Sequence, residues 1–254
     1  MQLQEIEQHC ANVKLVDMWI HRPIFFIVLG LFQRTILMSG TASSSWSLVE
    51  DPVHYAVQLA AQLNCSLPRN MLQHHSQIIS CLRAKPLSDL YSVQLTAPSF
   101  LIAMGPSRDG VLIPSDFGTT VVSFGKRSAS PVFRVILGVT ENEARDLFSE
   151  EELENGINSR EKDRLLRTLV RNTYTYHLNE IYYTVQNEYS NYQGREMTPR
   201  ETRSLVSSAL NDKLYISPVL ETAAWCNQSG YSTYLYIQKV NRREKSLCSV
   251  FPPS

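Results

Sequence analysis

Two carboxylates that follow a short apolar stretch are the first residues of this sequence that could do chemistry. Glu141 and Glu143 come directly after residues 132–139, which are mostly apolar and rich in β-branched side chains. Such a stretch predicts a strand that is buried on both faces of a parallel sheet. Open α/β sheets bind ligands outside the carboxyl ends of their strands, so we expect residues 140–145 to display catalytic or recognition groups.

An acid at Glu143 could support acyl transfer only together with a nucleophile and a base. No two of the ten glycines are four positions apart, so the sequence contains no Gly-x-Ser-x-Gly elbow that would present a serine. The residues therefore give Glu143 no nucleophile of this kind to serve.

The five cysteines form no Cys-x-x-Cys pair and have no histidine at ligand spacing, so we expect no metal site. Cys65 and Cys81 enclose about 15 residues, and a disulfide between them would contribute roughly 3 kcal/mol in the chain-entropy model. Two separate buried thiols are the alternative for a cytosolic chain. Sequons at Asn64 and Asn227 would accept N-glycans if the chain is secreted.

The elements that must position these residues are strands separated by long helical segments. Apolar patterns predict strands near residues 35, 136 and 235, which is the organisation of a doubly wound parallel sheet. Helical spacing predicts helices over 52–63, 71–82, 161–170, 178–189 and 202–212 and after Pro218. Between them we expect an edge hairpin or excursion over 98–114, a surface turn over 123–130 and an acidic solvated loop over 150–158.

Composition indicates one large domain. The 254 residues are 43% hydrophobic and carry 24 basic and 24 acidic side chains, so no net field attracts nucleic acid.

Residues 1–29 are interpreted as an irregular leader, because their apolar run is well short of the roughly 20 residues that cross a bilayer. Their start also lacks the basic character of a signal peptide. Residues 241–254 are expected to form an unstructured tail.

The order of the motifs resembles the type B carboxylesterase and cholinesterase group, and most closely its non-catalytic adhesion members, the neuroligins. The resemblance rests on Leu31 to Trp46 with its Ser-Gly-Thr-Ala-Ser-Ser-Ser-Trp passage, Cys65 and Cys81, Gly105-Pro106, Asp109-Gly110, Ile113-Pro114, Leu137-Gly138-Val139, Glu143, Ser217-Pro218 and Thr233 to Tyr236. It covers residues 30–240 and implies an incomplete α/β-hydrolase fold, the C-terminal half of the sheet. Glu143 then occupies the position of the acid in a Ser-His-Glu triad. The histidine that the family places after the last strand has no counterpart here, because no histidine follows His177. The resemblance therefore implies that Glu143 is a docking group or a relic of a catalytic site.

The resemblance implies a cell-adhesion protein of the synaptic plasma membrane that binds a neurexin-type receptor and does not catalyse. The corresponding loop faces that partner, near a calcium ion held largely by the partner, and the protein needs no cofactor of its own. By position, the partner-binding candidates are Glu141, Asn142, Glu143 and Arg145. The loop departs from the glutamine and glycines of the vertebrate family, which leaves the identity of the partner open.

The family also forms homodimers through a helical bundle, and the helix over 178–189 resembles one of its members. The candidate contact residues are Leu178, Ile181, Tyr182, Val185 and Tyr189. The residues alone allow the alternative that this stripe packs into the core with its polar tips at the rim.

Two alternatives to the adhesion hypothesis remain open. The chain could be a fragment of an active carboxylesterase whose serine-bearing half is absent from this sequence. It could also be too small a part of a sheet to fold stably alone, since a strand edge and the apolar faces of helices 52–63 and 178–189 would lack partners. Poor solubility is then expected.

Overall fold

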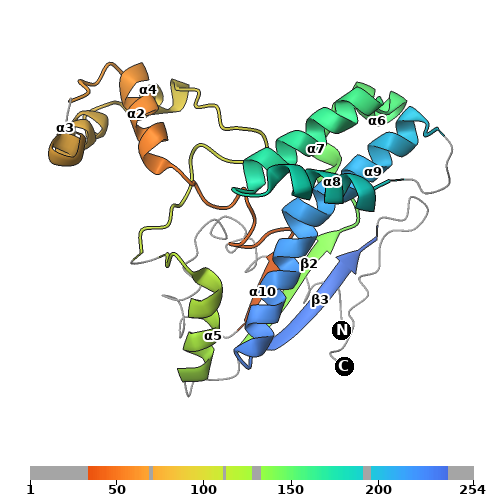
Figure 1. Ribbon diagram of the computed structural model, residues 1–254. Coiled ribbons are helices and arrows are strands. Elements are labelled where there is room, and N and C mark those ends of the chain that lie inside the picture. The colour runs from red at the N-terminus through yellow and green to blue at the C-terminus, as the bar shows by residue number, and fades with distance from the viewer. Residues whose placement is uncertain (1–33, 69–70, 111–112, 128–132, 191–195, 240–254) are drawn as a thin grey trace, which may run out of the picture.

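The computed structural model describes residues 34–68, 71–110, 113–127, 133–190 and 196–239. The leader over 1–29 and the tail over 241–254, both predicted from sequence, lie outside the described residues. Three strands form a parallel sheet in the order β1-β2-β3, with bounds β1 Arg34–Met38, β2 Arg134–Thr140 and β3 Ser232–Gln238 (Figure 1). The predicted parallel sheet is confirmed, and the strand that precedes Glu143 is its central one.

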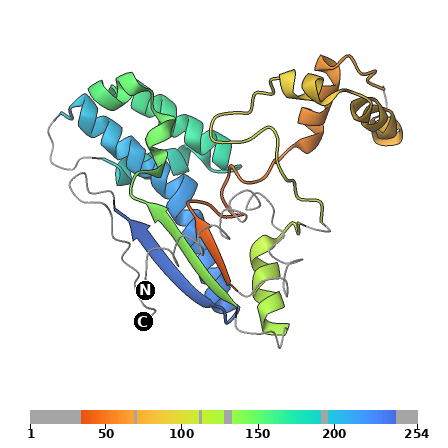
Figure 2. The ribbon, with the colours of Figure 1, turned by 180° about the vertical axis from the view of Figure 1, so that it is seen from behind.

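The register of the strands places one row of apolar side chains toward α10, Ser217–Gln228. Leu137 of β2 pairs with Leu37 of β1 and with Leu235 of β3, so these three side chains share a face of the sheet. Helix α10 lies across one face in Figure 1, and Figure 2 shows the sheet from behind, with the strands in front of that helix. The core between helix and sheet consists of Phe133, Val135, Leu137, Val139, Val219, Ala223, Cys226 and Tyr231.

On the opposite face of the sheet, the Tyr236 ring lies over Gly138, and the position of the ring requires a glycine there. A Cβ atom on Gly138 would lie 2.2 Å from carbon atoms of the Tyr236 ring, in the neighbouring strand. Because real Cβ contacts are never this short, only glycine lets the ring lie against β2.

A second core lies among the helices that follow β2. It is built from α7 Ser159–Thr173, α8 Leu178–Glu188 and α9 Pro199–Asn211, and its fully buried members include Leu166, Leu169 and Leu210. Helix α9 begins with a capping box in which Thr198 and Glu201 exchange hydrogen bonds, and Pro199 occupies its first turn. A π-helical turn, Asp212–Ile216, joins α9 to α10.

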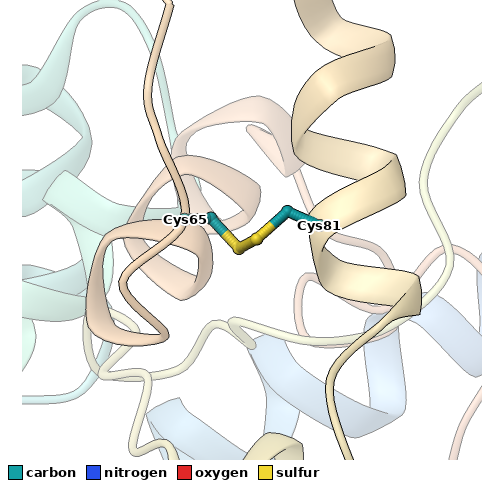
Figure 3. Close-up of a disulfide and its surroundings, with 2 residues drawn as sticks. All are labelled: Cys65 and Cys81. Atoms are coloured by element: carbon teal, nitrogen blue, oxygen red, sulfur yellow. A yellow bond between two sulfur atoms is a disulfide. The ribbon is translucent and has the colours of Figure 1, made fainter.

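The helices α2 Pro52–Gln62, α3 Met71–Arg83 and α4 Leu87–Ser92 stand away from the sheet in both views (Figures 1 and 2). We call residues 52–92 the disulfide lobe, because Cys65 and Cys81 are bonded across it with their Cα atoms 5.9 Å apart (Figure 3). This confirms the predicted disulfide. The lobe has a small core of its own, made of Ala60, Cys65 and Ile78.

Several predicted segments differ from the structure. Residues 150–155 are not a solvated loop but helix α6, Glu150–Asn155, because Ser149 and Glu152 form a capping box and three glutamates of the first turn complement the helix dipole. Residues 123–127 belong to helix α5, Phe117–Arg127, rather than to a surface turn. Within residues 98–110 the only described β-contact is an isolated bridge between Ser107 and Val49. Of the two expected alternatives, the hairpin is therefore not formed there, and the segment is an excursion.

Candidate functional site

The acidic loop, residues 140–145, begins at the carboxyl end of β2 and is flanked by the carboxyl ends of both neighbouring strands. It runs into a short 3₁₀ helix, Glu143–Leu147. The Glu141 N–H donates to the carbonyl oxygen of Gln238 at the end of β3, at 3.0 Å. On the other side lies Ser39, which follows β1 and has a left-handed backbone with φ of 59°. The loop is therefore at the predicted edge of the sheet.

Glu143 directs its carboxylate inward, toward this edge. Its Oε1 atom accepts a hydrogen bond from the Thr140 N–H at 2.5 Å and one from the Ser39 hydroxyl at 2.5 Å. The Ser39 N–H in turn donates to the carbonyl oxygen of Gly138 at 2.8 Å. Within the described residues, the carboxylate at the triad-acid position thus binds a serine and the loop backbone, and no histidine contacts it.

Besides Ser39, Asn211 at the end of helix α9 contacts the loop. Its Oδ1 atom accepts the Glu143 N–H at 3.0 Å, and its Nδ2 atom lies 3.5 Å from the carbonyl oxygen of Glu141. Sequence reasoning missed this residue. Asn211 is 68 positions away from Glu143 and belongs to another element, so no local pattern could have connected the two.

The other three partner-binding candidates, Glu141, Asn142 and Arg145, are solvent-exposed. They line one side of a groove of about 680 Å³, whose other side is formed by α6 and α9. The remaining lining residues are Phe148, Glu150, Leu153, Glu154, Arg203, Ser204, Ser207, Ser208, Asn211, Asp212 and Ile216. The structure therefore separates the four candidates into an internal anchor, Glu143, and three outward side chains that border a polar groove.

The predicted dimer stripe on α8 faces mainly into the chain itself. Tyr182 is 3% exposed, and Ile181, Val185 and Tyr189 pack against the second core, whereas Leu178 is 37% exposed. The Tyr189 hydroxyl donates to Asp212 at 2.5 Å, and its burial and this bond raise the pKa of Tyr189.

Asn64 and Asn227, the two sequon asparagines, are exposed. Asn64 follows α2 with a left-handed backbone, φ of 54°, and Asn227 lies in the last turn of α10. Both amides are accessible to a glycan in the folded chain.

Within the described ranges, no three histidine, cysteine, aspartate or glutamate side chains lie together where they could hold a metal ion. Across those same ranges, every helix is too short or too polar to span a bilayer.

Comparisons with known proteins agree with this geometry. The sequence pattern of the carboxylesterase family matches residues 21–251. The chain is 31% identical over 221 residues to neuroligin-1 of Caenorhabditis elegans, which covers 84% of this chain and 27% of that protein. It is 26% identical over 210 residues to neuroligin-3 of Mus musculus, covering 82% and 24%, and 26% identical over 197 residues to neuroligin-2 of Homo sapiens, covering 76% and 22%.

The chain therefore spans about a quarter of the length of the curated relatives that it matches. The matches confirm the resemblance to neuroligins. Together with the parallel sheet, they also confirm an α/β-hydrolase fold, of which the described strands are a part.

Proposed function

Because the chain belongs to the carboxylesterase family, we propose that it carries the receptor-binding loop of a non-catalytic, neuroligin-like adhesion protein of the synaptic plasma membrane. The partner is a neurexin-type cell-surface receptor. The observation that carries the proposal is the position of Glu143, whose carboxylate holds the acidic loop in place while Glu141, Asn142 and Arg145 face solvent.

The hydrogen bonds of Glu143 support a role in holding the acidic loop. In a triad, the acid orients a histidine and stabilises its positive charge. Here one carboxylate oxygen already accepts two hydrogen bonds, from Thr140 and Ser39. A buried N–H that loses its acceptor is costly, so the loop favours keeping Glu143 in this position.

Calcium at the interface fits this chain only as a shared ion. Ca²⁺ takes about six to eight oxygen ligands. Glu141 and Asn142 could offer a carboxylate and an amide oxygen, which fills a minor part of such a shell. The partner would supply most of the ligands, as the family resemblance implies.

A homodimer of the full-length parent is part of the proposal, but its contact surface keeps only Leu178 of the predicted stripe. Ile181, Tyr182, Val185 and Tyr189 are committed to the core of this chain. Helix α8 would therefore meet a second copy through its outer face, where Leu178 and Tyr183 are 37% and 62% exposed.

The test is a binding titration of the full chain against an immobilised neurexin ectodomain in calcium. We expect Glu141→Lys and Arg145→Glu each to weaken binding about tenfold or more, because both side chains border the groove and like charges across an interface repel. Glu221→Lys is the matched control, an exposed glutamate on α10 that should leave affinity unchanged. Chelation of calcium should abolish binding of the wild-type chain.

A purified full-length parent protein that hydrolyses a nitrophenyl ester at an enzyme-like rate would favour the carboxylesterase alternative. Equal affinities of wild type and both charge reversals would remove the acidic loop from the interface.

A further inference from the structure

The side chain of Asn211, at the end of helix α9, reaches the acidic loop from a distant part of the chain. We propose that Asn211 is a positioning residue for partner recognition, which fixes the loop backbone so that Glu141, Asn142 and Arg145 keep one arrangement. This inference rests on the proposed function of the loop and adds to it a residue outside the loop.

The contact joins two parts of the loop through one amide group. Asn211 is 6% exposed, so its amide is withdrawn from water. The Oδ1 atom accepts the Glu143 N–H at 3.0 Å, while Nδ2 faces the Glu141 carbonyl oxygen at 3.5 Å. Buried polar groups strongly favour having a partner, so the backbone on both sides of Asn142 follows the position of this amide.

Helix α9 gives the amide a rigid support. Val206, Ala209 and Leu210 are 1%, 2% and 0% exposed within the second core, so the end of the helix is fixed by packing. Asn211 is the last residue of α9, and the π-helical turn begins directly after it. A shift of the Asn211 backbone would have to move Leu210 in a close-packed environment.

The outward side chains need such an anchor because they have none of their own. Within the described part of the chain, the side chains of Glu141, Asn142 and Arg145 form no hydrogen bond or ion pair. Their arrangement is therefore defined by the backbone that carries them. Holding a binding loop in its bound conformation reduces the ordering cost of association, so the backbone anchor should contribute to affinity.

The experiment measures amide hydrogen exchange and neurexin binding for the full chain and three variants. Asn211→Ala removes both contacts, and Asn211→Asp keeps an acceptor for the Glu143 N–H. Asn172→Ala is the matched control, since the Asn172 amide donates to the Ser99 carbonyl oxygen at 3.0 Å, at a different loop.

In the Asn211→Ala variant we expect the amide hydrogen of Glu143 to exchange at least about tenfold faster. We also expect this variant to bind the neurexin ectodomain about tenfold more weakly, mainly through faster dissociation. Asn211→Asp should restore the exchange protection of that amide. Asn172→Ala should change neither quantity, although it also deletes an amide hydrogen bond at the end of a helix.

Unchanged exchange of Glu143 in Asn211→Ala would overturn the inference. So would exchange that is faster while neurexin affinity stays the same, or protection that Asn211→Asp fails to restore. A wild-type chain that binds no neurexin at all would instead contradict the proposed function, and the exchange data would still decide whether Asn211 holds the loop.

Discussion

Removal of the Cys65–Cys81 disulfide should unfold the disulfide lobe while leaving the sheet intact. The bond closes a loop with a sequence separation of 16, which corresponds to about 3 kcal/mol of chain entropy in the unfolded state. Among the side chains that the structure describes, the core of the lobe has three buried members, Ala60, Cys65 and Ile78. Since helices α2 and α3 contact chiefly each other, little else can replace the lost constraint.

The perturbation is the double variant Cys65→Ala and Cys81→Ala, compared with the wild-type chain with and without a reducing agent. Hydrogen exchange across residues 52–83 should accelerate by roughly two orders of magnitude, the factor that corresponds to about 3 kcal/mol. Exchange across β2 should stay unchanged. The reducing agent should reproduce the effect in wild type and do nothing further to the double variant.

Two results would refute this reasoning. Exchange in α2 and α3 that changes less than about fivefold would mean that side-chain packing, and not the bond, holds the lobe. Equal acceleration in β2 would mean that the lobe and the sheet unfold as one cooperative unit.

Three further predictions concern the sheet and its core. Ile237→Lys on β3 should raise the soluble fraction of the full chain, because Ile237 is 50% exposed on a strand with no further described partner, while Leu220→Lys on α10, 52% exposed, should not. Gly138→Ala should lower the free energy of unfolding in urea by about 1–3 kcal/mol, because Tyr236 must move aside. Burial raises the pKa of the Cys226 thiol from 9.0 to about 12. As the pH rises, the thiol therefore loses its proton in the unfolded chain before it does so in the folded chain, and the free energy of unfolding falls between pH 9 and 12. Cys226→Ala should remove this fall from the free energy of unfolding measured in urea across that pH range.

The strands and most helices could be predicted from sequence because their burial repeats along the chain. The run before Glu143 is apolar at nearly every position, and Val135 and Leu137 are indeed fully buried. Helix α6 was missed because its residues are almost all acidic, with no apolar period. Its one local signal was the capping box, a serine at 149 followed by a glutamate at 152.

Which surface an element meets could not be predicted in the same way. Helical spacing correctly grouped Tyr182 with Val185, but spacing does not say whether a stripe meets the same chain or a second copy. The role of Asn211 depends on where the end of α9 lies relative to the end of β2, a relation that exists only after folding. The same holds for the Ser39 hydroxyl, 104 residues from Glu143.

The π-helical turn at Asp212–Ile216 lies within one continuous helical segment, from α9 to α10, that packs in both cores. Upstream of it, Val206 and Leu210 point into the helical core; downstream, Val219 and Ala223 point at the sheet, and Tyr215 touches both groups. A π turn holds about one residue more than an α turn, so it changes the rotation of α10 about its axis relative to α9 and lets the two apolar stripes face different cores. Deleting a single residue there would rotate α10 by about 100° relative to α9 and turn its apolar stripe toward water. The length of this turn thus sets how the end of α9, where Asn211 contacts the acidic loop, is oriented relative to the sheet.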